Sequence, residues 1–212
     1  MWVVPSEPRR RLSGDHGSAL VEAGLLSPVF LFIVLATVEY GFFFSSYLSV
    51  GRATTDAARA ASVLGNNPTA DYQIVQSIKA STAALAPSDV KKIIVFKAMN
   101  GFGSTVPAAC QPTVDAPIAV TGSDCNGYTG SASFNVAEVR FGCVAPNNLS
   151  QGYCPTSRKV AFTAPQPAPL PPGPDYIGVY IRYNHTMLTG LFEEDHMISE
   201  TVITRVEPSE VS

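Results

Sequence analysis

The sequence predicts an α+β protein: a long N-terminal helix of the membrane or filament kind, then a small head with one helix and an antiparallel sheet. Three observations carry this prediction. Residues 23–51 contain a single charged residue, Glu39. Two segments near the C-terminus alternate apolar and polar residues, as half-buried strands do. Between these regions, residues 101–174 hold all four cysteines and most of the chain's prolines, which predicts a loop-rich, disulfide-bonded head.

The length of 212 residues allows one ordinary domain with an appendage. We expect three parts: a basic leader in residues 1–17, the long helix in residues 18–64, and a head in residues 65–212 whose residues 101–174 are a Cys- and Pro-rich insertion. The net charge is −3, and basic residues cluster only at positions 9–11. Nucleic acid is therefore not expected as a partner.

The apolar run predicts a retained transmembrane segment at residues 23–50. It is too long for the core of a secretory signal, and no small pair typical of a cleavage site interrupts it before Ser45 and Ser46. The arginines that precede the apolar run favour a cytoplasmic location for the N-terminus. The expected topology is single-pass in the cytoplasmic membrane, with a cytoplasmic N-terminus and an extracytoplasmic head.

Within the helix, Pro28 removes one backbone donor, so we expect a kink and a freed carbonyl at Gly24. Beyond it, small residues recur at every fourth position up to the end of the helix. These residues are Gly41, Ser45, Ser49, Ala53, Ala57, Ala61 and Gly65. Residues four apart share one helix face, so this small-residue strip predicts close approach of another helix. The alternative is a helix that packs on its own head.

In the head, Thr69 is the expected cap of a helix that carries Ile74, Val75, Ile78 and Leu85 on one face and stops at Pro87. Residues 91–97 read as a strand, and the alternation over residues 134–141 suggests another. Residues 176–183 and 198–206 are expected to pair antiparallel. The proline-rich residues 151–174 are expected to be extended.

The four cysteines are Cys110, Cys125, Cys143 and Cys154. Their spacing contains no CxxC, which disfavours a zinc cluster. An even number in an exported region predicts two disulfides. The neighbour pairing, Cys110 with Cys125 and Cys143 with Cys154, closes the shortest loops, but the other two pairings stay open.

The sequence does not predict an enzyme, a cofactor or a metal centre. It contains no GxSxG, HExxH, Walker loop or GxGxxG motif. Residues 193–196, with His185 before them, carry side chains that could act as metal ligands. Consecutive side chains on a strand point to opposite faces, and a solvated acidic loop is the better interpretation.

One set of residues at the N-terminus resembles a known family. The set comprises Gly17, Glu22, Pro28, Glu39-Tyr40-Gly41 and Ala57-Ala58-Arg59. In this order and spacing it resembles the TadE-like pseudopilins, or minor pilins, of the tight-adherence (Tad or Flp) pilus system. The resemblance is specific over residues 17–64, weaker over 176–206 and absent between them.

The resemblance implies a prepilin-type leader that a membrane peptidase cuts after Gly17, so that Ser18 becomes the first residue and Glu22 the fifth. The Glu22 carboxylate can then neutralise the new ammonium of an adjacent subunit in an apolar filament core, where an unpaired charge is costly. The alternative is a solvated acid at a helix N-terminus. Glu39 is a second candidate for assembly, or an acid that snorkels to the interface beside Tyr40.

The expected function is thus that of a minor pilin or pseudopilin in assembly of a Tad type IV pilus, and through it in surface adherence. Its expected partners are the membrane, other pilins and pseudopilins, the prepilin peptidase and the Tad assembly machinery. The alternative is a signal-anchored extracytoplasmic binding domain, whose helix is only an anchor.

Overall fold

The computed structural model describes residues 16–65, 67, 69–111, 125–138, 141, 173–190 and 195–207. Its contacts divide the chain into two compact units, Met1–Gly41 and Phe42–Ser212. We call the second unit the head. It includes the second half of the long helix, which is part of its core. Most of the expected leader and of the proline-rich stretch lies outside the described residues.

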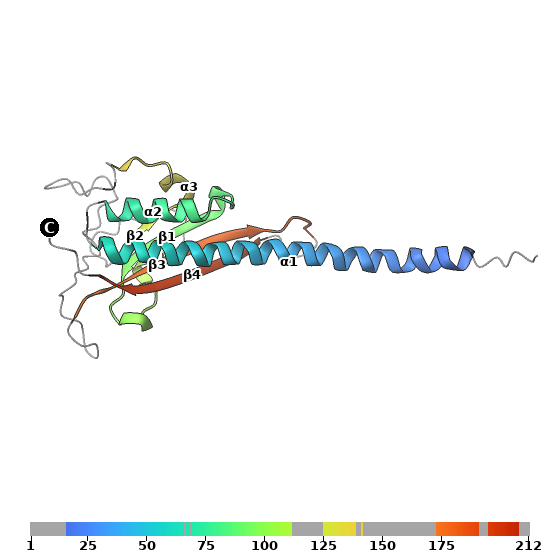
Figure 1. Cartoon of the computed structure of the whole chain (residues 1–212), viewed down its shortest axis with the longest axis horizontal. Coiled ribbons are helices and arrows are strands. Elements are labelled where there is room, and N and C mark those ends of the chain that lie inside the picture. The colour runs from blue at the N-terminus through green and yellow to red at the C-terminus, as the bar shows by residue number, and fades with distance from the viewer. Residues whose placement is uncertain are drawn as a thin grey trace, which may run out of the picture. The chain divides into compact units, whose positions relative to one another are not determined.

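The long helix α1 is a single α-helix over His16–Leu64 (Figure 1), which confirms the prediction. It continues through Pro28, whose missing N–H leaves the carbonyl of Gly24 without its helical donor. The hydroxyl of Ser27 donates to that carbonyl at 3.4 Å. A neighbouring side chain thereby replaces the lost donor, and the helix continues past the proline.

The head contains a four-stranded antiparallel sheet in the order β2-β1-β3-β4. Its strands are β1 (Val90–Lys97), β2 (Cys125–Tyr128), β3 (Tyr176–Thr186) and β4 (Asp195–Arg205). β3 and β4 pair antiparallel with Val179 opposite Val202 and His185 opposite His196. The predicted strand pair is confirmed, as is the strand over residues 91–97. β2 was not predicted.

Two helices cover one face of this sheet, the second half of α1 and α2 (Ala70–Ser81) (Figure 1). The layer between them holds apolar residues from both helices and from the central strands, such as Ile78, Ile93 and Val179. A second, smaller cluster that includes Ile94 and Phe96 comes from the alternate residues of β1. Alternation along a strand sends successive side chains to opposite faces, so β1 serves both cores.

The C-terminal part of the small-residue strip lies in the core of its own chain. Ala53, Ala57 and Ala61 are 0% exposed and belong to the cluster between α1 and the sheet, whereas Gly41 and Ser45 are exposed. The expectation that another helix approaches along the whole strip is therefore wrong at these alanines. They lack bulk because α1 must lie close to the sheet of its own head.

Two details of the predicted head are also corrected. Helix α2 ends at Ser81, before Pro87, and the Thr69 hydroxyl bonds to Asn67 Oδ1 without capping the helix. Residues 134–138 form no strand; they follow a short helix, α3 (Gly130–Ser133). Phe134 and Phe141 both enter the core cluster, so these aromatic residues are apolar anchors of a turn and not one side of a strand.

One disulfide joins Cys110 to Cys125, with their Cα atoms 6.2 Å apart. This bond confirms the predicted neighbour pairing for the first two cysteines. It ties β2 to the segment that follows β1, in the smaller cluster. The expected bond between Cys143 and Cys154 lies outside the described residues.

Candidate functional site

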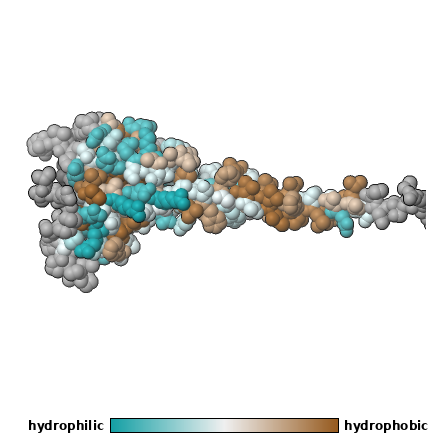
Figure 2. Space-filling view, viewed as in Figure 1, coloured by the Kyte–Doolittle hydropathy of each residue, from teal (hydrophilic) through white to brown (hydrophobic). Residues whose placement is uncertain are grey.

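The candidate site is the exposed apolar surface of α1 in the first unit. Large hydrophobic side chains stand exposed along it (Figure 2): Leu20, Val21, Leu25, Leu26, Val29, Phe30, Leu31, Phe32, Ile33, Val34, Leu35 and Val38. The helix is long and apolar enough to cross a membrane, and its most apolar window is 0% buried. From Ala19 to Tyr40 this surface extends about 32 Å at the helical rise, close to the ~30 Å of a bilayer core.

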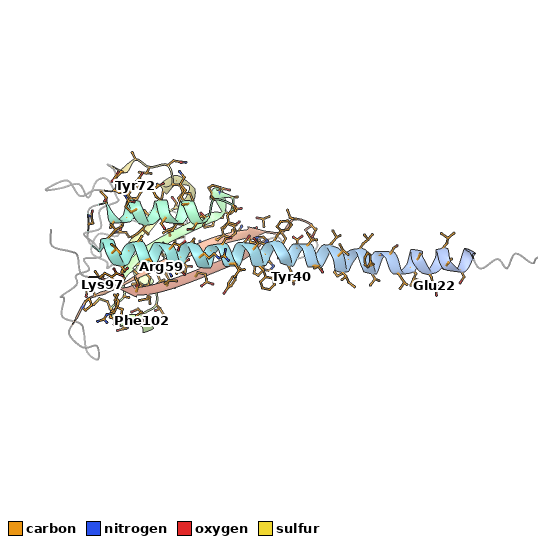
Figure 3. All side chains as sticks on the ribbon, viewed as in Figure 1. Glu22, Tyr40, Arg59, Tyr72, Lys97 and Phe102 are labelled. Atoms are coloured by element: carbon orange, nitrogen blue, oxygen red, sulfur yellow. A yellow bond between two sulfur atoms is a disulfide. The ribbon has the colours of Figure 1, made fainter. Side chains whose placement is uncertain are left out.

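The predicted processing site lies in the first turn of this helix. Gly17 and Ser18 are exposed, and nothing lies within 4 Å of where a Gly17 side chain would be. Glu22 is exposed too (Figure 3). Since Ser18 precedes Glu22 by four residues, both lie on one face of the helix, one turn apart. Cleavage after Gly17 and pairing of Glu22 both stay predictions.

The second predicted acid, Glu39, is buried, unlike the adjacent Tyr40. Glu39 is 2% exposed, whereas Tyr40 is 49% exposed. The alternative in which Glu39 snorkels into water beside Tyr40 therefore does not fit the structure. A role of Glu39 in assembly stays a prediction.

At the start of the head, an aromatic and histidine cluster joins α1 to the β3–β4 pair. The ring of Phe43 packs edge-on against His185 and His196, with centroids 5.6 and 5.8 Å apart. The Nδ1 atom of His185 is 3.1 Å from the Ser46 hydroxyl oxygen. Because Phe43 and Ser46 are three residues apart, both side chains face the sheet from one side of the helix.

The two histidines were candidates for a metal site, together with residues 193–195. The antiparallel register brings His185 and His196 together, but residues 193 and 194 lie outside the described part of the chain. Within the described residues, no group of three or more His, Cys, Asp or Glu side chains could hold a metal ion. The described side chains of the cluster pack and hydrogen-bond where α1 contacts β3 and β4.

A buried tyrosine lies next to this cluster. Burial raises the pKa of the Tyr183 hydroxyl above its ordinary value of 10.0, and the nearby carboxylate of Asp89 raises it further, while a hydrogen bond with Ser46 lowers it. The phenol is therefore kept neutral at physiological pH, as expected for a structural hydroxyl.

Sequence reasoning missed one buried polar network in the head. The carboxylate of Asp71, in the first turn of α2, accepts a 2.6 Å hydrogen bond from the Asn126 side-chain amide and another from the Tyr128 hydroxyl. All three residues are buried. The network attaches β2 to α2, and an acid in the first turn of a helix was the only signal in the sequence that could have suggested it.

A surface groove of about 590 Å³ runs between α1 and β4. Its charged lining residues are Arg52, Asp56, Arg59 and Glu200, and Asp56 accepts a 2.9 Å hydrogen bond from Ser81. These side chains mark the part of α1 whose outward face is charged and not apolar.

Residues 17–59 match the family model of the TadE-like proteins, which confirms the resemblance over that segment. No curated protein and no solved structure among those compared matches the chain. The match covers the exposed apolar helix and the first part of the head's core helix, and it ends before α2 and the sheet.

Proposed function

We propose that this TadE-like chain is a minor pilin or pseudopilin of a Tad (Flp) pilus, which acts in pilus assembly and through it in surface adherence. The observation that carries the proposal is the family match over an exposed apolar helix. The match indicates a Tad pilus-associated protein with an N-terminal apolar helix. The assembly role is the step that we add.

The exposed helix suits two environments in turn. In a bilayer its large apolar side chains face lipid, at no cost in unpaired backbone groups because the helix satisfies them internally. In a filament the same side chains pack against the helices of other pilins and pseudopilins, which are equally apolar. The same apolar surface can therefore face lipid before assembly and contact other subunits in the pilus.

A charge pair that includes Glu22 would fix the axial register of the assembled subunits. After the prepilin peptidase cuts behind Gly17, Ser18 would carry an ammonium one helical turn from Glu22. A Glu22 carboxylate that pairs with the ammonium of a neighbouring subunit leaves neither charge alone in an apolar contact. Breaking such a pair costs ~3–5 kcal/mol.

The orientation that we propose places the N-terminus in the cytoplasm and the head outside. The arginines ahead of α1 support this orientation through the positive-inside rule. The Cys110–Cys125 disulfide supports it independently, since such bonds persist in oxidising compartments. There the head is available to the Tad assembly machinery.

Replacement of Glu22 tests this proposal. In cells that make the pilus, Glu22→Ala should leave the membrane level of the protein unchanged and strongly reduce its amount in sheared surface fractions. Glu22→Gln should behave like Glu22→Ala, because the charge and not the size of the side chain forms the pair. Equal amounts of wild type and variants in the sheared fraction would refute the assembly role.

A helix exchange separates the proposal from the anchor-only alternative. Residues 18–41 are replaced by an unrelated transmembrane helix of equal length, which preserves the head and its attachment. The pseudopilin role predicts a stable membrane protein that does not restore pili to a strain lacking the chain. Restored pili would show that the helix is only an anchor.

A further inference from the structure

The apolar surface of α1 does not end where the head begins. Among the first seven residues of the head, four large side chains are exposed to between 44 and 59%: Phe42, Phe44, Tyr47 and Leu48. Only from Arg52 onward do the outward positions become charged, with Asp56 and Arg59 following at helical spacing. The change from an apolar to a charged outward surface therefore lies between Leu48 and Arg52, inside the head.

The end of the β3–β4 hairpin lies beside the apolar side of this boundary. Leu188, which follows β3, is 70% exposed and lines a cavity of about 240 Å³ together with Phe42 and Ser46. Phe42 precedes Arg52 by ten residues, or about 15 Å along the helix. The residues that follow β3 therefore lie beside an apolar part of α1, about 15 Å along the helix from Arg52, the first outward charge.

We propose that these residues form a second membrane contact, which seats the head on the lipid bilayer. We call the surface of Phe42, Phe44, Tyr47, Leu48 and Leu188 the base patch. Its proposed occupant is the interfacial layer of the bilayer, and the inference rests on the proposed insertion of α1. The head is then held by two elements, α1 and the hairpin end, and not by a single flexible tether.

The dimensions of α1 support a lipid occupant. Within the head, the stretch from Phe42 to Leu48 measures about 9 Å at the helical rise, close to the ~5–8 Å that one headgroup layer adds to the hydrocarbon core. The apolar surface up to Tyr40 fills the hydrocarbon core, so the base patch falls in the outer interface. Aromatic residues are enriched at that depth, and three of the five residues in the patch are Phe or Tyr.

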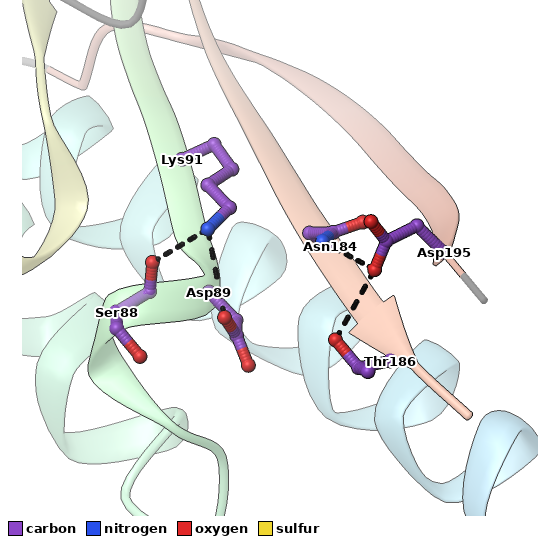
Figure 4. A network of polar contacts seen from close by, with 6 residues as sticks. All are labelled: Ser88, Asp89, Lys91, Asn184, Thr186 and Asp195. Carbon is purple, nitrogen blue, oxygen red and sulfur yellow. Dashed lines mark hydrogen bonds and ion pairs between the residues drawn. The ribbon is translucent and has the colours of Figure 1, made fainter. Parts of the chain in front are cut away.

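Two carboxylates at this level of the described head, Asp89 and Asp195, have polar partners (Figure 4). Asp89, which lines the same cavity, is 3.5 Å from the Lys91 ammonium, and Lys91 also donates to the Ser88 carbonyl. At the hairpin, Asp195 accepts hydrogen bonds of 3.0 Å from Asn184 and 3.3 Å from Thr186. Hydrogen-bonded and paired groups of this kind tolerate the headgroup layer, where an isolated charge would be costlier.

Tryptophan quenching by lipid measures the depth of the hairpin end directly. The chain's only tryptophan, Trp2, is changed to Phe, and the full-length protein carries Leu188→Trp in vesicles with brominated acyl chains. Leu31→Trp reports on the inserted helix. Phe102→Trp is the matched control in the head. It is exposed to 68%, and its ring packs against Tyr176, the first residue of β3. From Tyr176 to the other end of β3 at Thr186, the strand spans about 33 Å.

The proposal predicts that bromolipid removes most of the fluorescence at position 31, removes a smaller but clear part at position 188 because that residue lies in the outer interface, and leaves position 102 unchanged. Quenching at 31 without quenching at 188 would overturn the second contact and leave the membrane anchor intact. Absence of quenching at position 31 would overturn the anchor and the contact together. Equal quenching at positions 102 and 188 would indicate non-specific adsorption of the head to the vesicle and would overturn the proposal. Emission at position 188 that changes with the number of protein molecules per vesicle, and not with bromolipid, would assign the patch to contact with a second copy of the chain.

Discussion

Ala57→Leu should destabilise the head, because Ala57 has no room for a larger side chain. The residue is 0% exposed between α1 and the sheet. Three added carbon atoms at a packed site force side chains off their rotamers or move the helix, at a cost of ~1–3 kcal/mol. In a protein of this size that corresponds to a decrease in Tm of roughly 2–12 °C. Thermal unfolding of the full chain in detergent, followed by circular dichroism, measures the decrease.

Ser45→Leu is the matched control for this prediction. Ser45 lies on the same small-residue strip, three turns earlier, and is exposed. It should leave Tm unchanged, since the added side chain extends away from the core. If Ala57→Leu melts at the wild-type temperature, or if Ser45→Leu lowers Tm equally, the assignment of the strip to the head's own core is refuted.

Three further predictions concern the head. Asp71→Ala should lower the free energy of unfolding by ~2–6 kcal/mol in denaturant titrations, because it removes two buried hydrogen bonds to a carboxylate, from the Asn126 amide and the Tyr128 hydroxyl, at ~1–3 kcal/mol each; a loss below 1 kcal/mol would contradict the network. Removal of the Cys110–Cys125 bond, whose partners are 15 residues apart, should cost ~3 kcal/mol, measured as the difference between the doubly Ser-substituted and wild-type proteins without reductant. The pKa of Tyr183 is raised by burial, so its stabilising contribution is complete below pH 10 and is lost as pH rises through the higher folded pKa. The tyrosinate absorbance that develops late in an alkaline titration should be smaller in Tyr183→Phe than in the wild type.

The parts of the fold that were predictable are those with a long periodic signal. Helix α1 follows from a long apolar run that continues past Pro28, and β3 with β4 follows from alternation that the antiparallel register preserves, as at Val179 and Val202. The Cys110–Cys125 bond agrees with the neighbour pairing that closes the shortest loops, one of three pairings that the sequence leaves open. These signals are local in sequence, so composition and spacing suffice to read them.

The missed elements depend on contacts made far along the chain. β2 has the sequence Cys-Asn-Gly-Tyr, and Asn and Gly are depleted in strands. Its strand structure comes from pairing with β1, from the disulfide and from the bonds to Asp71. Short elements of this kind are formed by their neighbours, and sequence periodicity cannot reveal them.

The site shows the same division. The spacing of Gly17, Glu22 and Pro28 was readable because it lies within one helix, and the family match over residues 17–59 covers it. The small-residue strip was equally readable, but a smooth helix face does not say which surface it meets. At Ala53 and Ala57 that surface is the chain's own sheet. The apolar hairpin end at Leu188 gave no signal, since one exposed leucine is unremarkable until its place beside Phe42 is known.

The most direct test of the pseudopilin proposal is the N-terminal sequence of the protein isolated from native membranes of cells with an active prepilin peptidase. The proposal predicts a mature chain that begins at Ser18, with Glu22 as its fifth residue. Protein that begins at Met1, or that is cut beyond Ser45, would contradict it, because no ammonium would then stand one turn from Glu22.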